Sequence, residues 1–484
     1  MRLFAESFPN MSNDPATLSI AQAAQELENG SLSSAALVAA CAARITKENE
    51  TLNAFLEVFS DIDIQARHAD EQRARGVSHP LLGIPLAIKD NILIEGKHAS
   101  SASKILEPYV ASYDATVIAK LKAAGAVLMG RTNMDEFAMG SSTENSAYGA
   151  TKNPHDLSRV AGGSSGGSAV AVAADMALGA LGSDTGGSVR EPASFCGIVG
   201  LKPTYGALSR HGLMAMGSSL DQIGTFTKTV GDTEILFTAL AGIDPLDSTS
   251  ADLARYPEPP IRKTIGVPRH LLREGIDADV LASFEHTLQE LTEQGYTVVD
   301  IELPSAGLAL AVYYILMPAE VSANLARFDG VRYGLSLQGD SLFADYARTR
   351  AEGFGPEVRR RIMLGTYVLS AGYYDAYYRK AIHVRDMISS ELAKTLAHVD
   401  VIATPTVPSP AFKIGEKSDP IAMYLADIFT VTANLTGNPA LSVPMGSVAR
   451  DGSSLPVGIQ FTAVHGGEPL LFSIGKEVER IRIQ

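Results

Sequence analysis

Residues 162–190 read GGSSGGSAVAVAADMALGALGSDTGGSVR, a run of small apolar residues between two clusters of glycine and serine. Two flexible loops around an alanine-rich helix would have this composition. Flexible linkers do not usually flank a buried apolar helix, however, and glycines at such places let backbone N–H groups approach a ligand closely. The stretch therefore favours a buried helix between two loops that meet a ligand.

Familiar glycine-rich motifs do not explain these clusters. A phosphate-binding loop needs Gly-Lys-Ser/Thr after its glycines, and neither cluster contains lysine. A dinucleotide-binding motif follows a strand directly, and residues 153–161 are not strand-like. The pattern G-x-S-x-G at 162–166 matches the nucleophile elbow of α/β-hydrolases, but it lacks the apolar strand before it and a well-placed later histidine. What remains is a serine nucleophile that is activated without histidine.

A neutral lysine can act as the base for such a serine. Lys89 follows the apolar run LLGIPLAI at 81–88, which has the length and composition of a buried strand. Burial would lower the pKa of Lys89, because desolvation disfavours the charged form. The alternative is a lysine at a strand end that is paired with Asp90. No H-E-x-x-H or C-x-x-C motif is present, so no catalytic metal is predicted.

Elsewhere in the chain, helices that end at a glycine are followed by strands. Asp114 is predicted as the N-cap of a helix through Ala124, and residues 126–129 are predicted as the next strand. Residues 277–294 and 296–303 repeat this order of helix and strand. Such alternation favours an α/β fold with a mixed or parallel sheet.

The other elements extend this arrangement into one sheet-centred domain. Residues 18–45 predict two helices, with a break at Asn29-Gly30 and an N-cap for the second helix at Ser31 or Ser33. Three short strands close the chain, near 401–404, 441–443 and 457–462. A helical segment at about 305–400 is predicted to cover the substrate. Residues 1–14 are predicted as a flexible tail and 15–484 as a single domain.

The composition is that of a globular protein, with 46% hydrophobic and 19% charged residues among 484. A net charge of −14 argues against a general binder of nucleic acids or membrane surfaces, because phosphates repel an acidic surface. No secretory leader and no run of about 18 apolar residues is apparent, which predicts a soluble, cytoplasmic protein. Cys41 and Cys196 are predicted as buried thiols in a reducing compartment. The true start is either Met1 or Met11.

Motifs spread along the chain resemble the amidase signature family. Lys89-Asp90-Asn91 and the two Gly/Ser clusters occur in that family's order, with 75 residues from Lys89 to Ser164 and 24 from there to Ser188. Further stretches resemble the glutamine-hydrolysing subunits of bacterial Glu-tRNA(Gln)/Asp-tRNA(Asn) amidotransferases: 130–140, 200–204, 219–224, 327–330 and 372–378. The resemblance runs from about residue 15 to the end. It implies the amidase-signature fold, a central mixed β-sheet flanked by helices on both faces.

The same resemblance implies a Ser-Ser-Lys triad. Ser188 would attack the amide carbonyl, and Ser164, which would follow a cis peptide bond, would relay the proton to neutral Lys89. The oxyanion would be held by backbone N–H groups of the turn that ends at Ser188: Thr185, Gly186 and Gly187.

Glutamine is the substrate that the resemblance implies. An arginine among residues 359–361, by preference Arg360, would bind the α-carboxylate, and Asp427 would bind the α-amino group. Ammonia would pass to a large tRNA-binding subunit of the GatB type, which would use ATP and Mg to aminate Glu-tRNA(Gln), Asp-tRNA(Asn) or both. A small GatC-type subunit would complete a heterotrimer. The chain itself is predicted to bind no cofactor and to meet tRNA mainly through its partner.

Two other functions are compatible with the fold. A free-standing amidase for small or aryl amides would need neither Arg360 nor Asp427, and no partner. A catalytically silent scaffold would have no need of Lys89, Ser164 and Ser188 together, so their joint presence argues against it.

Overall fold

The computed structural model describes residues 14–257, 260–417 and 419–483. Thirteen strands lie within these residues: β1 (Phe55–Val58), β2 (Pro85–Lys89), β3 (Val127–Thr132), β4 (Lys152–Asn153), β5 (Asp156–Val160), β6 (Gly179–Asp184), β7 (Val199–Lys202), β8 (Gln222–Thr227), β9 (Thr264–Val267), β10 (Thr297–Asp300), β11 (Val401–Pro405), β12 (Ala440–Arg450) and β13 (Ser453–Thr462). The predicted tail lies outside the described residues except for Asp14, whose carboxylate accepts the backbone N–H of Ala16.

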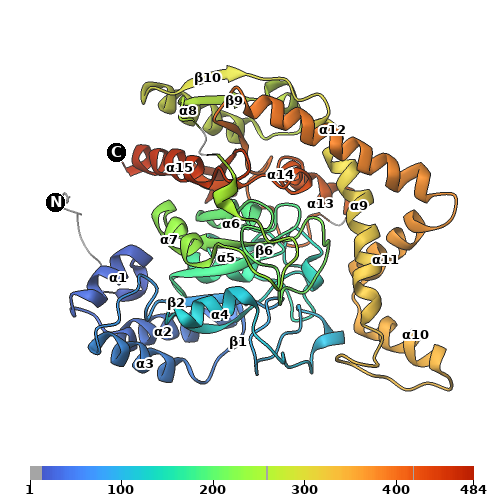
Figure 1. The fold of residues 1–484 in the computed structure, drawn as a ribbon, viewed down its shortest axis with the longest axis horizontal. Coiled ribbons are helices and arrows are strands. Elements are labelled where there is room, and N and C mark those ends of the chain that lie inside the picture. The colour runs from blue at the N-terminus through green and yellow to red at the C-terminus, as the bar shows by residue number, and fades with distance from the viewer. Residues whose placement is uncertain (1–13, 258–259, 418, 484) are drawn as a thin grey trace.

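The α-helices of the same residues are α1 (Ile20–Glu28), α2 (Ser34–Leu52), α3 (Ile62–Ala74), α4 (Thr116–Ala123), α5 (Gly166–Ala173), α6 (Arg190–Cys196), α7 (Val230–Leu240), α8 (Ala278–Glu293), α9 (Ala309–Asn324), α10 (Leu342–Gly353), α11 (Pro356–Leu369), α12 (Arg379–Leu396), α13 (Pro420–Tyr424), α14 (Val431–Thr436) and α15 (Glu468–Ile483). Figure 1 shows them around the sheet, with α9–α12 projecting on one side.

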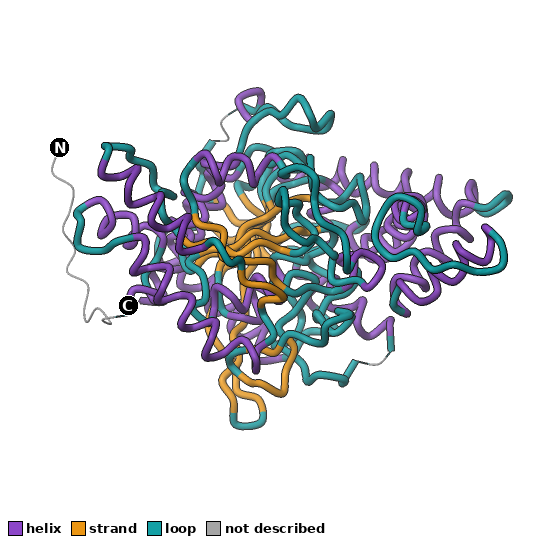
Figure 2. Tube along the Cα trace, turned by 90° about the horizontal axis from the view of Figure 1, so that it is seen from below, coloured by secondary structure: helices purple, strands orange, loops and turns teal. Residues whose placement is uncertain are grey.

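Eleven of the strands form one sheet, in the order β1-β3-β2-β6-β8-β7-β12-β13-β11-β9-β10. Its strands β3, β2 and β6 run parallel, as do β11, β9 and β10, and the pairs between these two groups are antiparallel. Seen from below, the strands occupy the centre and helices lie on both sides (Figure 2). The predicted mixed sheet with helices on both faces is confirmed.

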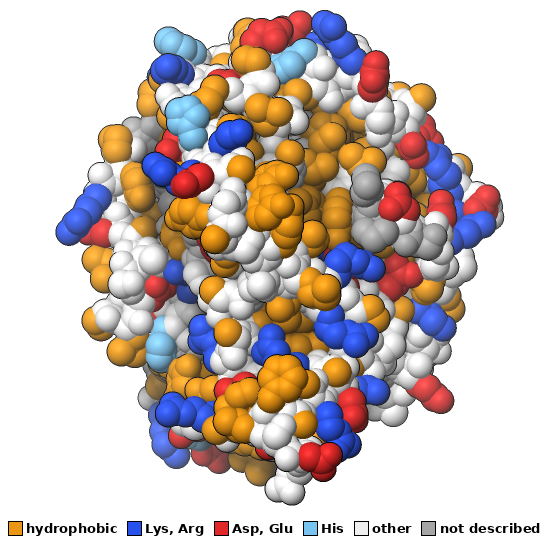
Figure 3. Space-filling model, turned by 90° about the vertical axis from the view of Figure 1, so that its right-hand side faces the viewer, with side chains coloured by type: hydrophobic (Ala, Val, Ile, Leu, Met, Phe, Trp, Pro, Cys, Tyr) orange, Lys and Arg blue, Asp and Glu red, His pale blue; other side chains and the backbone are white. Residues whose placement is uncertain are grey.

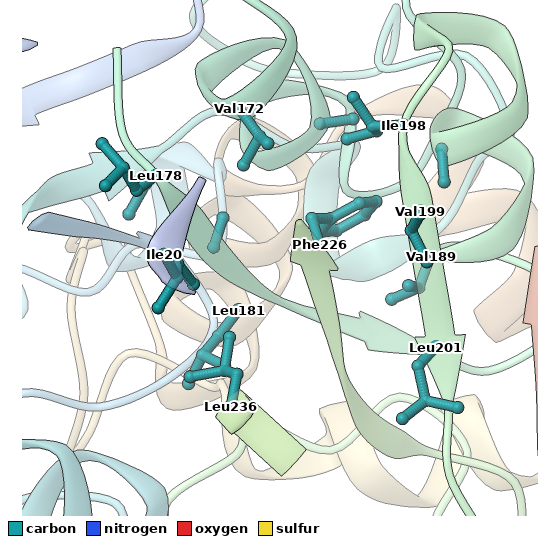
Figure 4. Packing of buried hydrophobic residues seen from close by; sticks show 14 of the residues in the cluster. Ile20, Val172, Leu178, Leu181, Val189, Ile198, Val199, Leu201, Phe226 and Leu236 are labelled. Atoms are coloured by element: carbon teal, nitrogen blue, oxygen red, sulfur yellow. The ribbon is translucent and has the colours of Figure 1, made fainter. Parts of the chain in front are cut away.

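Both faces of the central sheet are buried, so its central strands consist mainly of apolar and small residues, with a few buried polar side chains such as Lys89 at the end of β2 and Gln222 in β8. In β6, Ala180 pairs with Phe226 of β8, and the next residue, Leu181, points to the opposite face. Figure 4 shows Phe226 on the side of Val172 in α5, and Leu181 on the side of Leu236 in α7. The alanine-rich stretch of the sequence is therefore a core helix, as predicted, and it leads directly into the central strand β6.

The segment predicted as helical at about 305–400 forms α9–α12. Helix α9 packs on α11 and α12, and its Leu316, Met317 and Val321 belong to a second apolar core. Within the described residues, Ala306–Arg327 is the one segment that is long and apolar enough to cross a membrane, with 44% of its most apolar window buried. The sequence prediction was that no run of about 18 apolar residues occurs. This segment passes on mean hydropathy although Glu320 interrupts it, and in this fold it is a packed helix.

The outer side of this helical segment carries hydrophobic and basic side chains side by side (Figure 3). The exposed hydrophobic residues there include Phe343, Met363 and Tyr367. Both cysteines, Cys41 and Cys196, are buried and free, as predicted.

Among the local predictions, one N-cap is confirmed, whereas another N-cap and one assignment of a non-strand segment are wrong. Ser33 is the N-cap of α2. Ala115, not Asp114, precedes α4, because the Asp114 carboxylate accepts hydrogen bonds from the Glu95 N–H and from Lys122. Residues 153–161, predicted not to be strand-like, contain β5, which pairs with β4 in a two-stranded antiparallel ribbon outside the main sheet.

Candidate active site

Lys89 is the last residue of β2, and its side chain is completely buried. Its Nζ donates to Ser164 Oγ at 2.7 Å, to Ser165 Oγ at 2.7 Å and to Ser183 Oγ at 2.9 Å. Burial lowers the pKa of Lys89 to about 7, against the opposing effect of Asp135 and other buried carboxylates. A lysine in this state can exchange a proton with a serine hydroxyl near neutral pH.

Ser164 follows a cis peptide bond from Gly163, as the sequence resemblance predicted. A Cβ at Gly163 would lie 2.2 Å from the Asp135 carboxylate and 2.5 Å from the Ser142 nitrogen, so only glycine fits there. The Asp135 N–H donates to the Ser164 carbonyl at 3.1 Å. The backbone of Ser164 is therefore held by Asp135, and its hydroxyl accepts the hydrogen bond from Lys89.

Ser188 lies at the end of the turn between β6 and α6, with 7% of its surface exposed. The Ser165 N–H donates to the Ser188 carbonyl at 3.2 Å, which places this turn against the first Gly/Ser cluster. Asp184 and Arg190, both fully buried, form a bidentate ion pair across the turn at 2.9 and 3.0 Å. Burial alone would raise the pKa of Asp184, but Arg190 holds it down at about 2. Asp184 and Arg190 therefore stay charged, and their ion pair stabilises the conformation of the turn.

The donors available for an oxyanion differ from those predicted. The Gly187 N–H already donates to Asp184 Oδ1 at 2.9 Å, so Gly187 does not fit the predicted role. The N–H groups of Thr185, Gly186 and Ser188 have no loop hydrogen-bond partner among the described residues. Gly187 has φ +142, and a Cβ there would lie 2.4 Å from Thr430 Oγ1, which accounts for the glycine without a role for its N–H.

Asp427 lies beside this turn and is buried. The Thr430 N–H donates to the Asp427 carbonyl at 3.0 Å, and the Thr430 hydroxyl donates to the Gly186 carbonyl at 2.5 Å. The Asp427 carboxylate accepts hydrogen bonds from Ser141 Oγ at 3.1 and 3.2 Å and from Tyr314 Oη at 3.1 Å. Burial raises its pKa to about 7, and a nearby arginine, Arg361, opposes the rise.

Arg361, rather than Arg360, is the arginine that faces Asp427. Its side chain is 4% exposed and its guanidinium carbon lies 5.6 Å from the ring centre of Tyr314, which donates to Asp427. The Arg360 side chain is 45% exposed, and both arginines form ion pairs with Glu357 on the same helix, Arg361 through its Nε at 2.7 Å. Of the two, Arg361 is on the face of α11 that packs inward. Arg360, the residue preferred from the sequence, is on the exposed face but also lines the cavity described next, and its role stays a prediction.

A cavity of about 200 Å³ adjoins these charges. Its lining residues are Gly140, Asn145, Pro356, Glu357, Arg360, Arg361, Lys417, Met423 and Tyr424. Tyr314 and Tyr424 stack with ring centres 3.9 Å apart, and Arg361 lies 5.5–5.6 Å from both rings. The cavity is small, and its lining carries the cationic side chains of Arg360, Arg361 and Lys417 beside the carboxylate of Glu357, which suits a compact zwitterion.

A model of the amidase family matches residues 36–472. The chain belongs to the amidase family. The matched range contains Lys89, both Gly/Ser clusters and Asp427, so every part of the site described above lies inside it.

The similar proteins include an amidotransferase subunit and a peptide amidase. The A subunit of a glutamyl-tRNA(Gln) amidotransferase from Roseiflexus castenholzii is 52% identical over 475 residues, 96% of each chain. The crystal structure of the protein of the same name from Thermotoga maritima shares 43% identity with a TM-score of 0.77, over 96% of this chain and 94% of that one. A peptide amidase bound to chymostatin shares 30% identity with a TM-score of 0.81, over 96% and 97%. The fold is common to both kinds of amidase, whereas the sequence is nearer to the first.

The sequence had not singled out several residues of this amidase site. Ser165 Oγ and Ser183 Oγ accept hydrogen bonds from Lys89 Nζ at 2.7 and 2.9 Å, against 2.7 Å for Ser164 Oγ. Ser165 lies in the first Gly/Ser cluster and Ser183 at the end of strand β6, just before the second cluster. Tyr314 and Ser141 carry no motif of their own. No group of three or more His, Cys, Asp or Glu side chains in 14–257, 260–417 and 419–483 is placed to hold a metal ion.

Proposed function

We propose that this amidase is the glutamine-hydrolysing subunit of a tRNA-dependent amidotransferase. The observation that carries the proposal is that Arg361 and Asp427, which carry opposite charges, lie close to the Ser188 turn. An α-amino acid presents one carboxylate and one ammonium group, which these two side chains can bind. The 52% identity to the A subunit of a glutamyl-tRNA(Gln) amidotransferase, against 30% to a peptide amidase, supports the same function.

In this proposal Ser188 Oγ attacks the side-chain amide carbon of glutamine. Its proton passes to Ser164 Oγ, while the Ser164 proton passes to neutral Lys89 Nζ. When the tetrahedral intermediate collapses, the C–N bond breaks and Ser164 donates a proton to the leaving ammonia, taking one back from Lys89. Water then hydrolyses the glutamyl ester by the same relay, which releases glutamate and regenerates Ser188.

The negative oxygen of the intermediate needs hydrogen-bond donors that are not already in use. The N–H groups of Thr185, Gly186 and Ser188 meet this requirement, and each such donor typically contributes about 3–4 kcal/mol to the transition state. The ion pair of Asp184 and Arg190 holds the backbone N–H groups of the turn in place before substrate binds. Little reorganisation of these donors is therefore needed during the reaction.

The partners belong to the same proposal. A GatB-type subunit with ATP and Mg would receive the ammonia and amidate Glu-tRNA(Gln), Asp-tRNA(Asn) or both, and a GatC-type subunit would complete the heterotrimer. The net charge of −14 is compatible with a chain that leaves tRNA to a partner in the cytoplasm. The alternative, a free-standing amidase, is favoured by the TM-score of 0.81 to the peptide amidase, although fold alone does not imply function.

Glutamine-dependent amidation of tRNA tests this function. The tagged chain, purified from its own cells with whatever subunits accompany it, is expected to release ammonia from glutamine and to convert Glu-tRNA(Gln) or Asp-tRNA(Asn) when ATP is supplied. Two co-purifying subunits are expected in the eluate. A lone chain that ignores glutamine and cleaves simple amides would identify a free amidase instead.

Arg361 and Arg360 make opposite predictions for glutamine binding. Arg361→Lys keeps the charge but loses the two-pronged donor, and a hydrogen bond to a charged group contributes about 1.5–3 kcal/mol. We therefore expect the KM for glutamine to rise about 10- to 150-fold. Arg360→Lys, the matched control on the neighbouring exposed position, is expected to change KM less than about threefold, as is usual for surface positions.

Steady-state ammonia release from both variants decides between the two arginines. Hydrolysis of a small amide without an α-carboxylate serves as the reference, since it should survive in both if the fold is intact. Equal effects of the two substitutions on the KM for glutamine would contradict the assignment of Arg361.

A further inference from the structure

Thr430 is a fully buried residue that bonds both to Asp427 and to the turn that carries Ser188. Its hydroxyl oxygen lies 2.5 Å from the Gly186 carbonyl oxygen and 3.1 Å from the Asp427 carbonyl oxygen, so its single proton serves mainly the nearer acceptor. Arg190 Nη1 donates to the Thr430 carbonyl at 2.9 Å. The backbone of Thr430 is therefore held in place while its side chain reaches the turn.

The turn has little of its own that would fix its shape. Gly186 and Gly187 are adjacent glycines, which restrict the backbone less than any other residue type. The peptide between them is instead held at both ends by side chains from other places in the chain. Its N–H donates to Asp184 Oδ1 at 2.9 Å, and its carbonyl accepts the Thr430 hydroxyl. Among the described residues, no backbone N–H of a loop or helix cap donates to this carbonyl, so the hydroxyl supplies the bond that it needs.

This peptide lies between two N–H groups that are available to an oxyanion. The Gly186 N–H precedes it and the Ser188 N–H follows it, and neither has a loop hydrogen-bond partner in the part of the chain that the structure describes. Rotation of the peptide plane would change ψ of Gly186 and φ of Gly187, and with them the relative direction of the two N–H groups. Donors of this kind stabilise a transition state only if they already point at the oxygen that becomes negative. A hydrogen bond to the carbonyl of this peptide therefore fixes the geometry on which oxyanion binding depends.

We propose that the Thr430 hydroxyl positions the oxyanion donors by holding the peptide between Gly186 and Gly187. Thr430 is then a positioning residue, which acts through the N–H groups of Gly186 and Ser188 rather than on the substrate. This inference rests on the proposed hydrolysis of an amide at Ser188 and deepens it. Loss of the hydroxyl affects the transition state and not the binding of substrate, because the oxyanion forms only after Ser188 has attacked.

The test compares Thr430→Ala with Thr430→Ser, two variants that differ only in the hydroxyl group. We expect Thr430→Ala to lower kcat for ammonia release from glutamine about 10- to 100-fold. Loss of a whole oxyanion donor typically costs about 10²- to 10³-fold, and a misdirected donor keeps part of its effect. The KM for glutamine is expected to stay within about threefold of the parent value. Thr430→Ser should restore kcat to within about fivefold of the parent.

Thr225→Ala is the matched control for removal of a buried threonine hydroxyl. Thr225 is also fully buried, and its hydroxyl has no hydrogen-bond partner among the described residues, so kcat should stay within about threefold of the parent. Thermal unfolding shows whether each variant is folded. If Thr430→Ala is not, Thr430→Val, which occupies the space of threonine without a donor, takes its place in the comparison with Thr430→Ser.

Three results would overturn the inference. A kcat of Thr430→Ala within about threefold of the parent would show that the hydroxyl is dispensable. Thr430→Ser as slow as Thr430→Ala would assign the effect to the lost methyl group, and a rise in KM without a fall in kcat would assign it to substrate binding near Asp427. A parent chain that ignores glutamine but hydrolyses another amide would instead overturn the proposed function, and the same comparison with that amide would still test Thr430.

Discussion

Ser188→Ala is expected to lower glutamine-dependent ammonia release by roughly 10⁴- to 10⁶-fold, the range seen when a serine hydrolase loses its nucleophile. The substitution removes the one atom that forms the covalent glutamyl ester. It leaves the ion pair of Asp184 and Arg190 and the free N–H groups of the turn unchanged. Glutamine should therefore still bind to the variant, with a Kd close to the KM of the parent.

The control for Ser188→Ala is a second buried serine on the helix that follows it. Ser194 Oγ is buried and has no hydrogen-bond partner in the described part of the chain, so Ser194→Ala should keep activity within about threefold. Thermal unfolding of both variants shows whether the fold is retained. Residual activity of Ser188→Ala within about tenfold of the parent would mean that another hydroxyl, such as that of Thr185, is the nucleophile.

Much of this site could be predicted from the sequence because its parts are local. The two Gly/Ser clusters flank one helix and one strand, so the short chain between them already brings the Ser164 and Ser188 loops together. The burial of Lys89 could be predicted from the apolar run before it, since the length and composition of that run favour a buried strand, whereas its role in a triad came from the resemblance. The alternation of helices and strands predicted a mixed or parallel sheet, and the resemblance implied the mixed one. The full strand order could not be predicted, because pairing between distant strands leaves no local pattern.

The sequence also contains a pattern that separates the three successive arginines by burial. In α11, the residues Val358, Arg361, Gly365 and Val368 are buried, at the spacing of three and four that marks one face of a helix. Applying this periodicity to the arginine run would have selected Arg361, because Arg360 falls off the buried face. The family resemblance alone located the three arginines but did not show which of them lies on the buried face of α11.

Gly187 and Glu191 show what a motif cannot reveal. The Gly187 N–H is taken by Asp184, three residues earlier, and such a bond depends on the path of the turn rather than on residue type. Glu191 looks like an ordinary helix residue in the sequence, but in the fold its side chain is fully buried and neither of its oxygens has a hydrogen-bond partner among the described residues. Burial of this kind is known only once the fold is known.

The pH dependence of the reaction should report the proton state of Lys89. The Lys89 side chain accepts a proton only when neutral, and its pKa is about 7 because it is buried. Below that pH the protonated form accumulates, so kcat/KM is expected to fall about tenfold for each unit of pH below about 6. Above about pH 8 the neutral form dominates, and the profile should level off.

Lys89→Met should remove both the activity and this dependence on pH. Methionine fills a similar volume without a titrating group, and loss of a general base typically costs about 10²- to 10⁴-fold in rate. Lys202→Met is the matched control, because Lys202 is also fully buried and burial likewise lowers its pKa to about 7. The Lys202 Nζ donates to the Pro203 carbonyl, not to a serine of the site. If the inflection near pH 7 disappears in Lys202→Met and persists in the residual activity of Lys89→Met, Lys89 is not the base; the opposite result assigns the inflection to Lys89.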